Sequence, residues 1–493
     1  MSVKRTRINE NFNTVQLGGS IDFSDFPSAE CVFRYFEDIS RIPRCSGNTA
    51  PIADYLEMFA KKHSLFFCRD KEDNLLIKKP ASKGYEQRPA VIIQGHTDMV
   101  RQCATNSSVD MDTEGVILFR NADMLGAFGT TLGADDGIAV AYMLALLSDN
   151  TLMHPPIEAL FTSNEEIGLL GAAAFDCSLL SGRTMINIDS DAEGIFTVGC
   201  AGGARVDVEL PLIRDIEGGS YFNLQIGGLR GGHSGTEINS GRENAIKILA
   251  EALLSLPELK ICKISGGNAD NAIPRSAEAV FTTKLQRSGE ILALVSRITD
   301  KYKEKEPDIH FEITRAAAAT LPFTEESSLK ICRLVGEEPT GVIEMSSEIP
   351  GLVETSLNIG IIKSNERSLS LTASVRSSKN EKKKELIKKV VNIAKKFGAE
   401  CSSHGEYPAW EYKKQSRICD LMRSEYERMY GKSPKITAIH AGLECGIFAG
   451  QIENLDCISI GPDNFDIHTT EERLSLSSAA RVWIFLLETL KKL

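Results

Sequence analysis

Residues 94–100 read Gln-Gly-His-Thr-Asp-Met-Val and follow an apolar run, Ala90–Ile93, that predicts a buried strand. Side chains two positions apart in extended chain point to the same face, so His96 and Asp98 leave the strand end side by side. A metal-binding histidine usually has its second ring nitrogen held by a carboxylate or carbonyl group. Asp98 is placed to hold His96, directly or by orienting the site nearby. Taken alone, the stretch indicates only a strand that ends in an aspartate turn. Whether His96 is a metal ligand therefore depends on the segments that follow.

The composition sets the broad class of the protein. A chain of 493 residues is too long for one compact core and predicts two or more domains. The apolar fraction of 42% and the charged fraction of 25% are typical of a soluble globular protein. The net charge of −11 argues against nucleic acid as a partner, and no apolar run approaches the length of a membrane span.

The terminus and the cysteines indicate a cytoplasmic protein. Residues 1–20 are polar and lack the apolar core of a secretory signal, so we expect a short disordered or docking arm there. The twelve cysteines are scattered from Cys31 to Cys457 without a C-x-x-C pair, which favours a reducing compartment over a disulfide framework. The basic run at 380–385 predicts the solvated face of an amphipathic helix.

The first part of the chain alternates between strands and helices. This alternation predicts an α/β sheet with covering helices, and the segment 138–147 is apolar on most faces, as in a buried helix. In such sheets the active residues gather beyond the carboxyl ends of strands, where His96, the pair Glu165–Glu166, and Asp189 all fall. The predicted strands are 74–78, 90–94, 157–161 and 184–188, and two helices are predicted within 27–63.

From about residue 202 the pattern changes to strands of alternating polarity, which suit a sheet with one face on helices and the other exposed. The expected fold class is α/β, with an inserted α+β domain over 203–402. The first domain, 1–202, would then be completed by 403–493. The predicted strands of the insert are 205–210, 277–285, 310–314, 352–362 and 369–376, and its helices are 243–254, 290–302, 325–335 and 382–397.

Five side chains are candidate metal ligands. Two imidazoles and three carboxylates suit one or two divalent transition metals, zinc foremost. Five ligands serve two ions only if one carboxylate is shared. Asp135 lies at a tight Gly-Ala-Asp-Asp-Gly turn and is the natural bridge. The five candidates are His96, Asp135, Glu166, Asp189 and His468.

The neighbour of Glu166 suggests a catalytic base. Glu165 and Glu166 are adjacent, so one can bind metal while the other faces the open side of the pocket. A free carboxylate there can take a proton from a water of lowered pKa, as in metal-assisted hydrolysis of an amide. The alternative interpretation of two glutamates at a helix start is complementation of the helix dipole.

These segments together resemble the M20-type metallopeptidase family, which includes aminoacylases, glutamate-releasing carboxypeptidases and cytosolic dipeptidases. The resemblance is strongest to the dipeptidases and spans nearly the whole chain in the expected order. It implies a zinc-peptidase-like catalytic domain and an inserted lid domain. The matching segments are QGHTDMV, TLGADDGIAVA, FTSNEEIGLLGA, MINIDSDAEG, LRGGHSGTEI, GGNADNAIPR, SVRSS, AIHAGLECG and ISIGPDNFDIH.

The resemblance implies a role for each matching residue. The five candidates above match the metal ligands, Asp98 matches the residue that orients His96, and Glu165 matches the general base. His233 matches a lid histidine that steadies the oxyanion. Asn271, Arg376 and the backbone at Gly442 match groups that hold the substrate's carboxylate, a role that suits a guanidinium. The cofactor expected is two Zn²⁺ per chain, with Mn²⁺ or Co²⁺ as alternatives.

The function that this resemblance implies is hydrolysis of unblocked dipeptides, including Xaa-His. Alternatives are hydrolysis of another amide, such as an N-acyl amino acid or a tripeptide, and a non-catalytic binding homologue. Three residues depart from the family: Asp136 and Asp191 stand where Asn and Glu are common, and Thr469 where Ser is frequent. None of them removes a ligand, so these departures bear on substrate specificity more than on activity. Relatives with a short lid dimerise through it. The long insert predicts instead that His233 acts within one chain, with a homodimer as the alternative.

Overall fold

The computed structural model describes residues 20–216, 220–317 and 320–493 and divides into two compact units. The first unit comprises Met1–Val198, Lys413–Thr437 and Leu443–Leu493, and the second comprises Gly199–Tyr412 and Ala438–Gly442. The arm expected at the N-terminus lies, apart from Ser20, outside the described residues.

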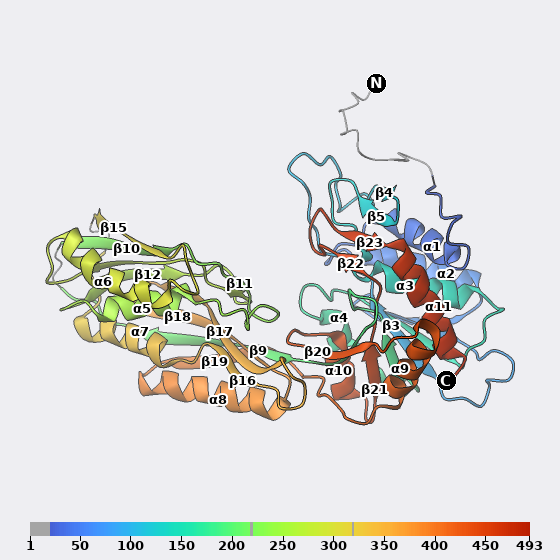
Figure 1. Cartoon of the computed structure of the whole chain (residues 1–493). Helices are drawn as coiled ribbons and strands as arrows, with labels where there is room; N and C mark the ends of the chain where they lie inside the picture. Colours follow the sequence, from blue (N-terminus) through green and yellow to red (C-terminus); the bar gives the residue numbers. More distant parts are fainter. Residues whose placement is uncertain (1–19, 217–219, 318–319) are drawn as a thin grey trace, which may run out of the picture. The chain divides into compact units, whose positions relative to one another are not determined.

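The first unit contains an eight-stranded sheet in the order β1-β2-β6-β3-β7-β21-β8-β20. Figure 1 labels three of its strands, β3, β20 and β21. Its four central neighbours, β6, β3, β7 and β21, run parallel to one another. Their carboxyl ends therefore meet at one edge of the sheet. The strands are β1 Phe66–Arg69, β2 Leu75–Lys79, β3 Val91–His96, β6 Ile157–Thr162, β7 Thr184–Asn187, β8 Ile195–Cys200, β20 Lys435–Ile439 and β21 Asp456–Ser459.

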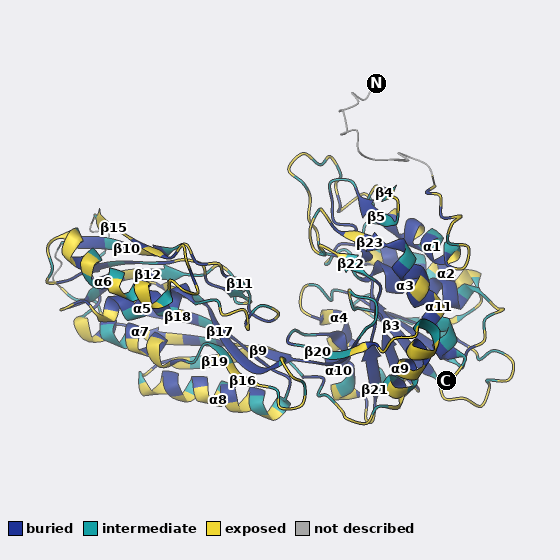
Figure 2. Ribbon diagram, viewed as in Figure 1, coloured by how far each residue is buried: buried dark blue, intermediate teal, exposed yellow. Residues whose placement is uncertain are grey.

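Helices pack around this sheet. Helix α3 packs against α1 and β3 and is buried over most of its length (Figure 2), because its apolar residues occupy all faces rather than one stripe. Among the described residues, no helix has both the length and the apolar character needed to cross a bilayer. The helices of this unit are α1 Glu30–Ser40, α2 Ala50–Lys62, α3 Ala134–Ser148, α4 Leu170–Ala174, α9 Arg417–Tyr430, α10 Glu444–Gln451 and α11 Leu476–Leu490, with a 3-10 turn at Cys177–Leu179.

A small sheet joins two distant parts of the first unit. It has the order β22-β23-β5-β4, with antiparallel pairing throughout. The pairing of β23 with β5 brings the C-terminal segment that carries His468 beside the segment that precedes Asp135. The strands are β4 Leu118–Asn121, β5 Met124–Ala127, β22 Asn464–Phe465 and β23 Arg473–Ser475.

The second unit is built on a nine-stranded antiparallel sheet. Eight strands follow the order β15-β10-β14-β12-β17-β18-β9-β19, and the ninth, β16, pairs with β17 outside this order. Helices pack on it through alternate buried residues of the strands, as the alternating polarity predicts (Figure 2). The strands are β9 Gly202–Pro211, β10 Tyr221–Gly227, β12 Lys260–Gly266, β14 Ala277–Thr282, β15 His310–Ala316, β16 Gly341–Met345, β17 Val353–Ser364, β18 Ser368–Ser377 and β19 Glu400–Tyr407. A separate pair is β11 Gly232–His233 with β13 Ala272–Ile273, and the helices are α5 Ala245–Leu254, α6 Ser288–Tyr302, α7 Glu325–Glu337 and α8 Asn380–Lys396.

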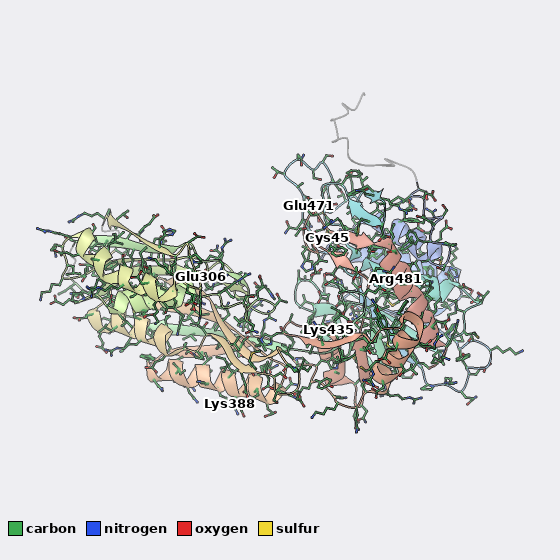
Figure 3. The ribbon with its side chains drawn as sticks, viewed as in Figure 1. Cys45, Glu306, Lys388, Lys435, Glu471 and Arg481 are labelled. Carbon is green, nitrogen blue, oxygen red and sulfur yellow. The ribbon has the colours of Figure 1, made fainter. Side chains whose placement is uncertain are left out.

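The basic start of α8 is only partly a solvated face. Lys384 is exposed, and Lys388 extends outward from the helix (Figure 3). Lys383, by contrast, is 1% exposed. Its ammonium donates to the carbonyl of Tyr407 at 2.5 Å and lies 3.1 Å from Glu406. The prediction was therefore wrong for Lys383. Each turn of a helix that packs on a sheet presents a side chain to that sheet, and in this turn the side chain is Lys383, which binds a carbonyl of β19.

A buried carboxyl group makes the stability of the second unit pH-dependent. Glu338 is 2% exposed, and neither of its carboxylate oxygens has a hydrogen-bond partner among the residues that the structure describes. Burial raises its pKa to about 8, although Lys247 opposes the rise. The folded chain therefore holds this proton more tightly than the unfolded chain. The stabilising contribution is fully present below the unfolded-state pKa and is lost as the pH rises to about 8.

We expect Glu338→Gln to remove this dependence. The variant should match the original protein at pH 5 and exceed its free energy of unfolding by about 2 kcal/mol at pH 9, because the amide cannot ionise. Urea unfolding at the two pH values measures the difference. Equal pH dependence in both proteins would contradict the assignment.

Candidate metal centre

One carboxylate lies between two histidines in the first unit. Asp135, at the start of α3, places Oδ1 3.0 Å from Nε2 of His96 and Oδ2 3.0 Å from Nε2 of His468. His96 ends strand β3 and is 1% exposed, whereas His468 comes from the loop between β22 and β23. His468 adopts φ = 61°, in the left-handed region that non-glycine residues seldom occupy. These three residues are far apart in sequence and meet at one point.

Two further carboxylates complete this cluster. Asp189 follows β7 and lies 3.8 Å from Nε2 of His96 through Oδ1. Glu166 follows β6 and lies 3.0 Å from Nε2 of His468 through Oε1. Potential ligand atoms within 4.8 Å of one another form three groups: His96, Asp135 and Asp189; Asp135, Glu166 and His468; and His96, Glu165 and Glu166.

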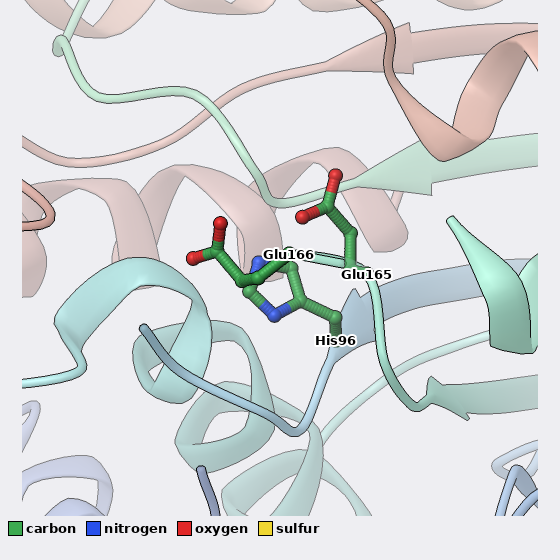
Figure 4. A group of neighbouring side chains, drawn as sticks. All are labelled: His96, Glu165 and Glu166. Atoms are coloured by element: carbon green, nitrogen blue, oxygen red, sulfur yellow. The ribbon is translucent and has the colours of Figure 1, made fainter. Parts of the chain in front are cut away.

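Glu165 joins this cluster rather than facing solvent. Figure 4 shows its carboxylate gathered with the side chains of His96 and Glu166 beyond the strand ends. Burial raises the pKa of Glu165 well above its usual value, against the opposing effect of His96. Both adjacent glutamates lie with His96, and Glu166 also contacts His468.

Asp98 ties the histidine to the glutamate loop. Its main-chain carbonyl lies 3.0 Å from Nδ1 of His96, while its carboxylate lies at 3.5 Å from the same nitrogen. The carboxylate accepts the backbone N–H of Glu165 at 3.0 Å and that of Glu166 at 3.3 Å, and also the hydroxyl of Ser46 at 2.7 Å. Asp98 therefore positions two loops at once, which the spacing of His96 and Asp98 alone does not indicate.

The charges in the cluster depend on one another. Burial alone would lower the pKa of His96, but hydrogen bonds with Asp135 and Asp98 raise it well above its usual value. Asp135 and Glu166 raise the pKa of His468 to about 10. Burial raises the pKa of Asp189, and neighbouring carboxylates add to the rise. The first unit thus concentrates negative charge that only a positive charge can balance at low cost.

The donor set fits divalent cations. Within the described part of the chain, Oδ2 of Asp189 is buried without a hydrogen-bond partner, and Oε1 of Glu166 contacts His468 without hydrogen-bond geometry. Imidazole nitrogens and carboxylate oxygens are the donors found at catalytic zinc sites. Two subsites that share Asp135 would each have two other ligands, which leaves room for a further ligand at each.

In the second unit, two predicted residues are neighbours. Strand β11 pairs with β13, so that His233 faces Ala272, and the carbonyl of Asn271 accepts the backbone N–H of Ser234 at 2.8 Å. Nδ1 of His233 accepts the backbone N–H of Thr236 at 3.2 Å. In the neutral ring this contact leaves the proton on Nε2, which can then donate.

The other two predicted residues of the second unit share one tyrosine. Nη1 of Arg376 donates to the hydroxyl of Tyr407 at 2.9 Å. A side chain at Gly442 would meet the Tyr407 ring at 2.9 Å, so glycine is needed there. Burial and the charge of Arg376 lower the pKa of the nearby His440 to about 4. Its Nε2 therefore accepts from, or donates to, Ser356 at 2.7 Å as a neutral ring.

The sequence alone missed several buried groups around the centre. Arg44 and Glu472 are 1% and 3% exposed and bind the backbone beside the ligands. Glu444 accepts from Gln94 and Thr162 beneath His96, and burial raises its pKa to about 7. No spacing rule points to them, because single charged residues in loops are normally solvated.

The comparisons with known proteins cover most of the chain. A family model described as a peptidase dimerisation domain matches residues 224–310. The cytosol non-specific dipeptidase of Escherichia coli (strain K12) is 34% identical over 475 residues, which cover 94% of this chain and 98% of the relative. The crystal structure of aminoacylhistidine dipeptidase from Vibrio alginolyticus matches with a TM-score of 0.84 and 32% identity, over 94% of this chain and 96% of that one.

A more distant structure shares the fold alone. A tripeptidase from Staphylococcus aureus subsp. aureus mu50 matches with a TM-score of 0.56 at 17% identity, over 94% of this chain and 98% of that one. The two relatives above 30% identity each cover 94% of this chain, so the likeness extends into both units. The chain therefore belongs to the M20 family of metallopeptidases, which hydrolyse peptide bonds.

Proposed function

We propose that this protein is a two-metal dipeptidase that hydrolyses unblocked dipeptides, including Xaa-His. The observation that carries the proposal is the position of Asp135, whose two oxygens lie 3.0 Å from Nε2 of His96 and of His468, with Glu165 in the same cluster. The names of the two relatives, a non-specific dipeptidase and an aminoacylhistidine dipeptidase, support the choice of substrate.

The proposed ligands divide into two sets. His96 and Asp189 would hold one ion, Glu166 and His468 would hold the other, and Asp135 would be shared. Zn²⁺ suits these donors, and Mn²⁺ or Co²⁺ would also be accepted. When bound, such ions lower the pKa of a water molecule and polarise a carbonyl group.

Glu165 is proposed as the general base. Its carboxylate lies with His96 in the candidate ligand cluster, and burial raises its pKa, as suits a group that takes up a proton. It would accept a proton from the attacking water and return it to the leaving amine. Asp98 would keep Glu165 and Glu166 in register with His96, through the backbone N–H groups that its carboxylate accepts.

The second unit is proposed to recognise the substrate. His233, with its proton on Nε2, would donate to the developing oxyanion. Arg376 and Asn271, with the backbone at Gly442, would bind the free carboxylate of the dipeptide. The hydroxyl of Tyr407 holds Arg376, so the guanidinium is positioned before substrate binds.

A substrate panel tests the proposal. The zinc-loaded full chain should hydrolyse several unblocked dipeptides, Xaa-His among them. Amidation of the C-terminal carboxylate of the dipeptide should lower kcat/KM by about 10²-fold or more, because Arg376 would no longer pair with that carboxylate. Tripeptides and N-acetyl amino acids serve as the competing substrates. A metal-loaded sample that leaves every dipeptide intact would reject the proposed function.

A further inference from the structure

One carboxylate in the first unit binds the turn that carries Asp135. Glu472 is 3% exposed, and its Oε2 accepts the backbone N–H groups of Leu132 at 2.9 Å and Gly133 at 3.0 Å. Its Oε1 accepts those of Ala134 at 2.8 Å and Asp135 at 3.3 Å. Four consecutive N–H groups at the start of α3 thus converge on a single side chain. A carboxylate is favoured there by the helix dipole.

A cation also holds the same segment, through a carbonyl of the turn. Nη2 of the buried Arg44 donates to the carbonyl of Gly133 at 2.5 Å, and Nη1 donates to the carbonyl of Thr97 at 3.0 Å. A side chain at Gly133 would meet Nη2 of Arg44 at 2.6 Å. Burial lowers the pKa of Arg44, and the charge of Glu472 opposes that effect. The Asp135 turn is therefore connected through Arg44 to Thr97, the residue that follows His96.

Glu472 also belongs to the loop that carries His468. It follows that histidine by four residues, its backbone N–H donates to the carbonyl of Thr469 at 3.3 Å, and Arg473–Ser475 begins pairing with β5 directly afterwards. His468 itself has a left-handed backbone, a conformation that surrounding contacts must maintain. One side chain therefore connects the loop of His468 to the turn of Asp135.

We propose that Glu472 is a positioning residue of the metal centre, whose carboxylate fixes the Asp135 turn to the His468 loop so that both ligands are in place before a cation binds. The proposal rests on the proposed two-metal site. Groups that orient metal ligands typically change metal affinity by about 10- to 100-fold when they are removed. The subsite that uses both Asp135 and His468 should depend on Glu472 most.

The test is a zinc titration of the metal-free full-length protein against a chromophoric chelator, which gives the number of sites and their affinities. In Glu472→Gln one oxygen becomes an amide donor, which repels the N–H groups it faces. We expect one of two sites to weaken by about 10- to 100-fold, with a much smaller change at the other.

Glu158→Gln is the matched control. Glu158 is 2% exposed in the same unit and accepts the backbone N–H groups of Ser181 and Gly182. It is no part of the candidate ligand groups found among the described residues. This variant should lower the melting temperature of the metal-free protein but leave both zinc affinities within about threefold of the original, since it touches no ligand loop.

Several outcomes separate the possibilities. Unchanged zinc binding by Glu472→Gln would overturn the positioning role. An equal loss of zinc affinity in Glu158→Gln and Glu472→Gln would overturn it too, because it would indicate general destabilisation. If the unaltered protein does not bind zinc at two sites, the proposed metal centre itself would be rejected. If Glu472→Gln does not fold, Glu472→Asp takes its place. It keeps the charge with shorter reach, and we expect a weaker loss, about 3- to 10-fold, at the same site.

Discussion

Glu165→Gln is expected to lower kcat by about 10²- to 10⁴-fold while the protein still binds its full complement of zinc. A general base contributes this range of rate, because the proton of the attacking water must be taken up in the transition state. Glu165 is placed for this role by its membership in the cluster with His96 and Glu166. KM should change little, since Glu165 makes no proposed contact with the bound dipeptide.

The neighbouring residue supplies the control for this experiment. Glu166→Gln removes a group that lies 3.0 Å from His468, so we expect it to weaken zinc binding as well as activity. Steady-state kinetics and zinc analysis of both variants separate the roles of the adjacent carboxylates. Wild-type kcat in Glu165→Gln would exclude Glu165 as the base, and loss of zinc from that variant would assign it as a ligand instead.

Asp135→Asn is expected to weaken both zinc sites at once. Residues that only orient ligands change metal affinity by 10- to 100-fold, so loss of a shared ligand's charge should cost about 100-fold or more at each site. Activity should fall with metal occupancy. In the metal-free protein the pKa of His468, which Asp135 and Glu166 raise to about 10, should move toward its ordinary value. NMR titration of the histidines measures this shift.

Asp136→Asn is the matched control, with the same chemical change one position later. Oδ2 of Asp136 accepts the backbone N–H of His96 at 3.2 Å, a bond that an amide oxygen can also make. The variant should therefore keep both zinc sites. Loss of only one site in Asp135→Asn would contradict sharing of that carboxylate between two ions.

Much of the fold could be predicted because periodicity reports burial directly. Parallel strands with continuous apolar runs and the apolar helix over 138–147 correspond to β3, β6, β7 and α3 within a few residues. Strands β10 and β12 were missed. They lie in the interior of the nine-stranded sheet, and their conformation depends on the neighbours with which they pair.

The candidate ligands could be proposed from local order along the chain. His96 ends one parallel strand, Glu166 and Asp189 follow two others, and parallel strands end at the same edge. The sharing of Asp135 was a deduction from valence, and its 3.0 Å distances to two histidines come only from the folded chain. The assignment of these residues as ligands stays a proposal that the variants above test.

The succession of strands and helices along the chain, the residue types that can hold a cation and the α/β class all follow from patterns within short segments, because hydrophobic periodicity and strand-end chemistry are local properties. The contacts that Glu472 and Arg44 make with the Asp135 turn follow from no such local pattern. Glu472 reaches backbone groups more than 300 positions earlier, at Leu132 and Ala134. Burying these charges costs free energy unless partners from distant segments surround them, and only tertiary packing brings those partners together.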